Sequence, residues 1–124
     1  MMMFAHGDGI APLISIIKSV LVEGTGRVVL FFVSSSADSV IFGRELQFLA
    51  EDNPDRLTVF HLLEDLQGVL ESTQFISMAM PFRNDEVYVC GHRLFLETVR
   101  EALSELAISA AKLHFDLSTS SAAR

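Results

Sequence analysis

Residues 5–12 read Ala-His-Gly-Asp-Gly-Ile-Ala-Pro, between a short apolar run and an apolar helical stretch that begins near Ile10. The glycines at positions 7 and 9 permit backbone angles, and a close approach to a ligand, that a Cβ would block. A helix that starts at this turn directs N–H groups and the positive end of its dipole toward an anion. The turn therefore predicts a phosphate cradle. An ordinary strand-to-helix turn remains the alternative, because the third glycine of the usual dinucleotide fingerprint is absent.

Strands and helices alternate along the rest of the chain. Continuous β-branched and aromatic runs are typical of parallel strands buried on both faces, and apolar residues at helical spacing are typical of the covering helices. The predicted strands are residues 1–5, 27–33, 57–63, 86–90 and 112–117. The predicted helices are residues 10–23, 39–51, 73–80 and 92–106, with Asp38 or Ser39 as the cap of the second. This order predicts an α/β fold, a three-layer α/β/α sandwich around a five-stranded parallel sheet.

The composition fits one apolar domain. A chain of 124 residues suffices for a single sheet with its helices. Half of the residues are hydrophobic and the mean hydropathy is +0.40, which indicates a sheet buried on both faces, a face that docks on a partner, or both. We expect one domain at residues 1–117, followed by a flexible tail at residues 118–124.

Charge and cysteine content exclude several classes of function. The net charge is −7, and no basic run is present that would bind nucleic acid. No stretch is long and apolar enough to span a membrane, and residues 1–4 lack the basic residues of a signal peptide, so we expect a cytoplasmic protein. The lone cysteine, Cys90, excludes an internal disulfide and a cysteine-ligated metal centre, and the four scattered histidines predict no metal site.

Three predicted loops meet at one edge of the sheet. Ligands of open parallel sheets lie beyond the carboxyl ends of the strands. We therefore expect one ligand, a dinucleotide, to contact all three loops, which are residues 7–12, 34–38 and 90–93. His6 and His92 flank two of these loops, so we expect them to meet at the cleft. Glu64, Asp65 and Glu71 are predicted to belong to a solvated loop.

Five sequence blocks resemble the pyridine-nucleotide domain of the ferredoxin–NADP reductase family in order and spacing. These blocks are GDGIAP at 7–12, SVIFGREL at 39–46, VYVCG at 87–91, VREAL at 99–103 and HFD at 114–116. They look most similar to the reductase components of multicomponent oxygenases, desaturases and hydroxylases of ketosteroids or phenylacetyl-CoA. In such reductases an FAD barrel precedes this ferredoxin reductase-like NAD-binding domain, which lies C-terminal to the barrel, and a plant-type 2Fe-2S domain often follows it.

The resemblance implies a set of site residues. The turn at residues 7–12 corresponds to the family's contact with the pyrophosphate and nicotinamide side of NAD(P)H, and residues 34–36 correspond to its adenosine-ribose loop. The implied cofactor-binding residues are Gly7, Asp8, Gly9, Ile10, Ala11, Pro12, Ser34, Ser35, Ser36, Cys90, Gly91, His92, Phe95 and Asp116. Cys90 corresponds to the cysteine near the family's hydride path and is the catalytic candidate. Without the resemblance, a lone cysteine at the end of a strand is more often a small buried hydrophobic residue than a reactive thiol. The serines also fit an ordinary polar loop with a helix cap.

Three positions depart from the family pattern. Asp8 replaces a neutral hydroxyl residue where two phosphates pass, and a carboxylate there repels them. Serine replaces the arginine or asparagine of the ribose loop, so no cation remains for a 2′-phosphate and NADH is favoured over NADPH. His92 replaces the proline after Cys90 and Gly91, which either loosens the nicotinamide pocket or adds a donor.

The resemblance implies an NAD(P)H-binding module that passes hydride to FAD held by a missing domain or a partner subunit, and onward to an iron–sulfur protein or an oxygenase. Hydride transfer requires both rings to be stacked, so this chain is not expected to act as an oxidoreductase alone. It would be a fragment of a larger reductase, a separate subunit or a stand-alone derivative. The alternative hypothesis is a degenerate nucleotide-binding fold, retained as an interaction or oligomerisation module, for example a homo-oligomer, without catalysis.

Overall fold

The computed structural model describes residues 1–117, which form a five-stranded, all-parallel sheet of order β3-β2-β1-β4-β5. The strands are β1 (Met2–His6), β2 (Val28–Ser34), β3 (Leu57–Leu63), β4 (Val87–Gly91) and β5 (Leu113–Leu117). The helices are α1 (Ile10–Glu23), α2 (Gly43–Asp52), α3 (Glu64–Gln67), α4 (Ser72–Ala79) and α5 (Arg93–Glu105). The predicted α/β class and parallel sheet are confirmed. The tail predicted at 118–124 lies outside the described residues.

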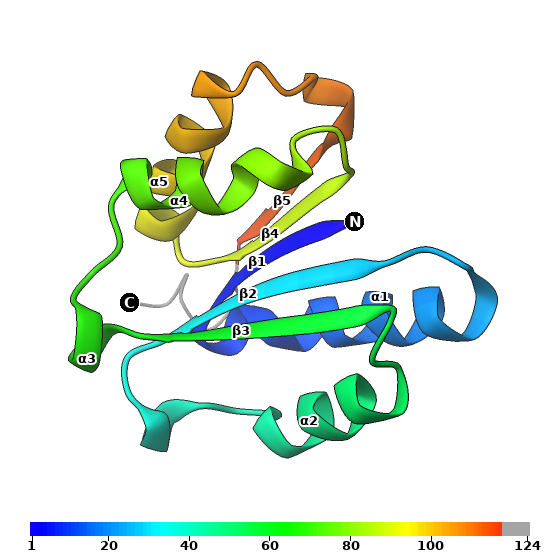
Figure 1. Cartoon of the computed structure of the whole chain (residues 1–124). Coiled ribbons are helices and arrows are strands. Elements are labelled where there is room, and N and C mark those ends of the chain that lie inside the picture. Colours follow the sequence, from blue (N-terminus) through cyan, green and yellow to red (C-terminus); the bar gives the residue numbers. More distant parts are fainter. Residues whose placement is uncertain (118–124) are drawn as a thin grey trace.

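The helices cover the sheet in two layers, with α1 and α2 on one face and α4 and α5 on the other (Figure 1). The chain moves outward from β1 through β2 to β3, then crosses to the other side of β1 to form β4 and β5. Right-handed crossovers in opposite directions place the connecting helices on opposite faces. The strand order therefore reverses between β1 and β4, and a crevice at the carboxyl ends of these strands is where such folds bind ligands.

Two hydrophobic clusters sandwich the sheet. One joins alternate residues of the strands to α4 and α5, and includes Phe4, Phe31, Phe75 and Val99. The other joins the intervening strand residues to α1 and α2. Every residue of β2 is buried, as predicted for a strand covered on both faces. Burial on both faces accounts for much of the high hydrophobic content of the chain. No helix of residues 1–117 is long and apolar enough to cross a bilayer.

The start of the second helix differs from the prediction. Ala37–Ser39 form a separate 3-10 turn, and α2 begins at Gly43, after Phe42 in the left-handed region at φ 58°. The Ser39 hydroxyl is already used within this turn, since it accepts from the Ser36 N–H at 3.0 Å and donates to the Ser36 carbonyl at 2.9 Å. Ser39 and Asp38 therefore do not cap α2, and the prediction of that cap was wrong.

Several other bounds differ by one residue at strand or helix ends, and two of these differences concern the site. Ser34 belongs to β2 and is buried, whereas the sequence placed it in the following loop. Gly91 likewise belongs to β4. The short helix α3, which follows β3 directly, was not predicted. The carboxyl edge of the sheet therefore includes a short helix, α3, in place of the expected loop after β3.

Candidate functional site

The two glycines of the turn after β1 are required for different reasons. Gly7 has a φ of +58°, and no heavy atom lies within 4 Å of the point that its Cβ would occupy. At Gly9 an added Cβ would lie 2.6 Å from the carbonyl carbon of Cys90, 2.9 Å from the nitrogen of Gly91, and closer still to the Cys90 oxygen. Gly9 therefore lets the turn pack on the end of β4, while Gly7 leaves the turn open to a ligand.

The turn leads directly into α1. Ile10 is fully buried and anchors the first turn of the helix in the core, whereas Ala11 and Pro12 are exposed. Asp8 is partly exposed in the turn. The N-terminal end of a 14-residue helix thus lies at the carboxyl edge of the sheet, where its dipole favours an anion. The carboxylate of Asp8 opposes that attraction.

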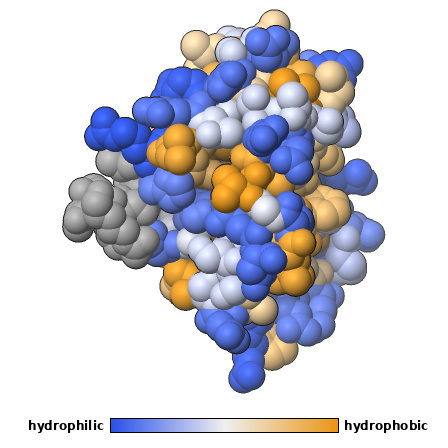
Figure 2. Space-filling model, turned by 90° about the vertical axis from the view of Figure 1, so that its left-hand side faces the viewer, coloured by the Kyte–Doolittle hydropathy of each residue, from blue (hydrophilic) through white to orange (hydrophobic). Residues whose placement is uncertain are grey.

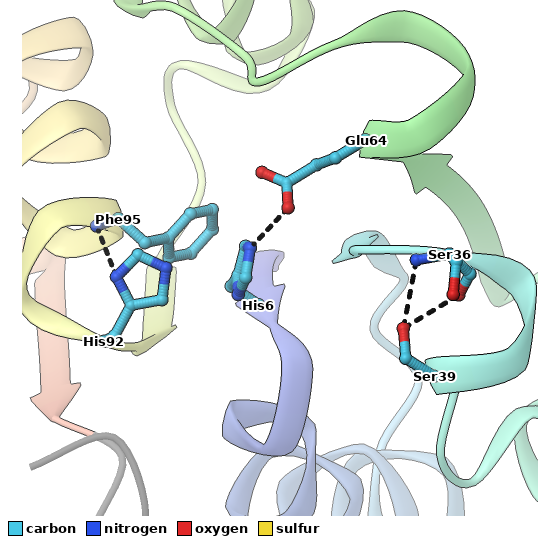
Figure 3. Close-up of polar contacts among 6 residues, drawn as sticks. All are labelled: His6, Ser36, Ser39, Glu64, His92 and Phe95. Atoms are coloured by element: carbon cyan, nitrogen blue, oxygen red, sulfur yellow. Dashed lines mark hydrogen bonds and ion pairs between the residues drawn. The ribbon is translucent and has the colours of Figure 1, made fainter. Parts of the chain in front are cut away.

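Ser34 offers an unused polar atom at the same edge. Its side chain is 1% exposed, and its Oγ has no hydrogen-bond partner among residues 1–117. An unpaired buried hydroxyl costs about 1–3 kcal/mol, so a ligand that bonds it regains that cost. The carbonyl of the exposed Ser35 accepts from the Asp65 N–H at 2.9 Å, and Ser36 bonds with Ser39 (Figure 3). Among residues 1–117, Ser34 is the predicted serine whose hydroxyl is buried and without a hydrogen-bond partner.

The end of β4 forms the opposite side of the switch point. A Cβ on Gly91 would lie 2.7 Å from Cδ2 of Phe95 and 3.1 Å from Cβ of His6, so the β4 turn packs closely on β1 and α5. His92 caps α5, since its Nδ1 accepts from the Phe95 N–H at 3.2 Å (Figure 3). The histidine that stands in place of proline therefore supplies a helix-capping acceptor that fixes this loop.

His6, Glu64 and His92 come together beside the turn. His6 Nε2 lies 3.1 Å from Glu64 Oε1, and the His6 and His92 ring centroids are 4.5 Å apart in an edge-to-face arrangement (Figure 3). The predicted meeting of the two histidines is confirmed. The assignment of Glu64 to a solvated loop was wrong, because its side chain is only 20% exposed. Its place directly after β3 was the available signal, since the carboxyl ends of all parallel strands lie at one edge.

This cluster borders a small pocket of about 100 Å³. Val69 and Leu94 line the pocket and are 74% and 64% exposed. Figure 2 views this side of the molecule, on which hydrophobic groups lie among hydrophilic ones. A larger cavity of about 850 Å³ lies at the amino ends of the strands, where Arg27 and Arg56 line it, and so belongs to the opposite edge.

The predicted site residues divide between the two faces of the sheet. Cys90 belongs to the cluster on the α1 side, and Ser34 faces the same side because it follows Phe32 by two residues. The His6 ring instead packs near Phe95, at 5.3 Å between centroids, on the α5 side. The glycine turn lies between the two groups. A ligand on the α1 side would therefore contact the turn, while His6 and Glu64 lie on the opposite side of the turn.

Asp116 is exposed on β5 and is paired in register with Cys90. Burial, and then the charges of Asp116 and Asp8, raise the pKa of the Cys90 thiol from 9.0 to about 11. The thiol is therefore protonated at neutral pH, and thiolate chemistry is not available to it. The catalytic role of Cys90 stays a prediction, and the contribution that its geometry supports is to shape the end of β4.

The raised pKa predicts a pH effect on stability. Below pH 9 the thiol is protonated in the folded and in the unfolded chain. Between about pH 9 and 11 it is protonated in the folded chain and ionises when the chain unfolds. The contribution of the protonated Cys90 thiol to the free energy of unfolding is therefore fully present below pH 9, and it is lost as the pH rises toward 11. Urea denaturation at pH 8, 9 and 10 should show a smaller loss of stability in Cys90→Ala than in the unchanged chain. Equal losses of stability in Cys90→Ala and in the unchanged chain would contradict the burial of the Cys90 thiol.

These features fit the phosphates of a dinucleotide. The open turn at Gly7, the end of α1 and the unpaired hydroxyl of Ser34 lie at one edge of the sheet, where strand order reverses. Within residues 1–117 no group of three His, Cys, Asp or Glu side chains could hold a metal ion.

Sequence comparison identifies relatives of this chain. Residues 3–101 match the model of a family described as the oxidoreductase NAD-binding domain. The chain is 41% identical, over 94% of its length, to the ferredoxin reductase component of 3-ketosteroid-9-alpha-monooxygenase from Rhodococcus rhodochrous. It is 40% identical over the same share to the component of that name from Mycobacterium tuberculosis. The chain spans about a third of the length of these curated relatives, 33% and 32% respectively.

Solved structures share the fold at lower identity. The cytochrome b5 reductase domain of Ulva prolifera nitrate reductase superposes with a TM-score of 0.78 at 17% identity, over 93% of this chain and 47% of that chain. The ferredoxin-NADP+ reductase from Plasmodium falciparum with 2'P-AMP also gives 0.78 at 17% identity, over 95% of this chain and 51% of that chain. The predicted likeness to the ferredoxin–NADP reductase family is thereby confirmed in sequence and in fold. The chain belongs to the oxidoreductase NAD-binding domain family.

Proposed function

We propose that the chain holds NADH across the carboxyl edge of its sheet and presents the nicotinamide to an FAD carried by another domain or subunit. The observation that carries this proposal is the coincidence of an open glycine turn, a helix N-terminus and an unpaired buried hydroxyl at the strand-order reversal. Membership of the NAD-binding domain family supports it.

The residues have separate tasks in this proposal. The turn around Gly7 and the end of α1 receive the pyrophosphate, and Ser34 bonds the ligand from the end of β2. Gly91 and His92, the cap of α5, shape the nicotinamide side, since Gly91 packs on the Phe95 ring and His92 accepts the Phe95 N–H. When bound, FAD would accept the hydride and pass electrons onward one at a time.

The nucleotide that fits best is NADH. Residues 34–39 contain no Lys or Arg, and they include Asp38. A 2′-phosphate at this loop would therefore meet a carboxylate and find no bidentate cation. The loop supports hydroxyl contacts to an unphosphorylated ribose.

The relatives suggest the rest of the electron path. They are named as reductase components of a monooxygenase and are about three times as long as this chain. We infer that this domain serves a reductase of that kind, in which electrons continue from FAD to an iron–sulfur protein or an oxygenase. The alternative of a non-catalytic interaction module is favoured by one residue, Asp8, and substitution of Asp8 tests it.

Calorimetric titration of the purified chain with NADH and NADPH tests the proposal. We expect saturable NADH binding and about tenfold weaker NADPH binding, the size of one lost charge-assisted contact. The chain mixed with free FAD should oxidise NADH no faster than free FAD does, because nothing in residues 1–117 is proposed to hold the flavin. Absence of NADH binding would contradict the proposed function. A preference for NADPH would contradict the assignment of residues 34–39 to an unphosphorylated ribose.

A further inference from the structure

Contacts among four connections hold the carboxyl edge together. The turn after β1 packs on the end of β4 through Gly9, and Gly91 packs on His6 and Phe95. The loop after β2 is tied to α3 by the hydrogen bond from the Asp65 N–H to the Ser35 carbonyl. A side-chain contact joins α3 to the end of β1, directly before the glycine turn, namely the 3.1 Å contact between Glu64 Oε1 and His6 Nε2.

Glu64 reaches the turn through His6. In Figure 3 its carboxylate extends from the start of α3 toward the imidazole of His6, at the end of β1. His6 immediately precedes Gly7, whose positive φ sets the open shape of the turn. The two side chains are 15% and 20% exposed, so water competes little for their hydrogen bond. The orientation of the His6 ring is further limited by His92 and Phe95, at 4.5 and 5.3 Å between centroids.

We infer that Glu64 is a positioning residue for nucleotide binding: by holding the His6 ring it keeps the Gly7–Gly9 turn in its open, ligand-ready conformation. The inference rests on the proposed function. Glu64 lies on the α3 side of the turn, and His6 packs on the α5 face rather than on the α1 face assigned to the ligand. Its effect on a nucleotide is therefore exerted through the backbone of the turn.

Positioning and simple electrostatics predict opposite results. Removing a carboxylate near two phosphates weakens repulsion and should tighten NADH binding if charge alone matters. If Glu64 positions the turn, its removal should weaken binding, because the turn must then be ordered when the ligand binds. The sign of the change in affinity therefore separates the two accounts.

The test compares Glu64→Leu, which loses the acceptor, with Glu64→Gln, which keeps an acceptor oxygen. Asp65→Asn is the matched control, since it removes a neighbouring charge and retains the backbone bond to Ser35. We expect Glu64→Leu to weaken NADH binding about fivefold to tenfold, the size of one ordinary hydrogen bond, and Glu64→Gln to restore it to within about twofold. Asp65→Asn should leave the affinity unchanged or raise it. Unchanged or tighter binding by Glu64→Leu would overturn the inference.

A second measurement keeps this inference separate from the proposed function. Imidazole nitrogen spectra of the ligand-free protein report the tautomer of His6, and backbone amide signals report the Gly7–Gly9 turn. In Glu64→Leu we expect His6 to lose its single hydrogen-bonded form and the turn amides to shift or broaden. If the unchanged chain fails to bind NADH, the proposed function fails, and these spectra still decide whether Glu64 orders the turn. Identical spectra in both proteins would refute the positioning role.

Discussion

Gly9→Ala is expected to destabilise the domain by about 3 kcal/mol, the upper range for overpacking a core, and to abolish NADH binding. The added Cβ would lie 2.6 Å from the carbonyl carbon of Cys90 and 2.9 Å from the nitrogen of Gly91. Both are backbone atoms of a strand that is hydrogen-bonded on two sides, so no side-chain rotation can relieve the clash. Thermal unfolding should show a decrease of about 10 °C in Tm for a domain of this size.

Two other glycines serve as matched controls. Gly26→Ala adds a Cβ where no atom lies within 4 Å, at a backbone angle that alanine adopts, and should change stability by less than about 0.5 kcal/mol. Gly7→Ala also meets no atom, but at φ +58°, and should cost about 1 kcal/mol. The expected order of damage is Gly9, Gly7, Gly26. A Gly9→Ala protein as stable as Gly26→Ala would contradict the close packing of the turn on β4.

Asp8→Ser is expected to tighten NADH binding about tenfold. Unit charges 4–6 Å apart interact by about 0.7–1 kcal/mol in bulk water and by about 3–4 kcal/mol at the effective dielectric constant of a protein surface, and a tenfold change, about 1.4 kcal/mol, lies between these limits. Asp8 stands in the turn assigned to two phosphates. The charge of Asp8 reaches the end of β4, where it contributes to the raised pKa of Cys90. The gain should shrink as salt is added, because ions screen the repulsion that the substitution removes. Calorimetric titrations at two ionic strengths measure both effects.

Asp8→Asn and Asp55→Ser complete this experiment. Asp8→Asn keeps the shape of the side chain and removes its charge, so it should also tighten binding. Asp55 is exposed near the amino ends of the strands and lines the cavity at the opposite edge, so its loss should leave the affinity within about twofold. If neither Asp8 variant binds NADH, the alternative hypothesis of a retained fold without nucleotide binding gains its main support.

Most of the fold could be predicted because the strands are covered on both faces. Runs such as residues 57–63 coincide with β3, and the apolar face of α5, including Phe95 and Val99, is buried as its spacing predicts. The error at the start of α2 arose from local hydrogen bonding. Ser39 is a good cap by residue type, but it bonds within its own 3-10 turn, and Phe42 takes a left-handed conformation that its type disfavours.

The site was less predictable because its residues depend on contacts between distant segments. The glycine turn and His92 are visible as motifs in the chain, but the two roles of Gly7 and Gly9 follow from what each one touches. Ser34 is one of three identical neighbours, and only its place at the end of β2 separates it from the others. Glu64 has no motif around it. Its place directly after β3 puts it at the carboxyl edge of the sheet, but its partner His6 lies 58 positions earlier, and no local pattern indicates that pairing.

The most direct test is to map NADH onto the chain by following backbone amide signals of the labelled protein during a titration. We expect saturable shifts at the carboxyl edge, in residues 7–10, 34–36 and 90–92, and unchanged amide signals in the rest of the strands. Shifts centred on Arg27, Arg56 and Phe60, which line the cavity at the amino edge, would contradict the assigned site. A titration without shifts at either edge would contradict nucleotide binding itself.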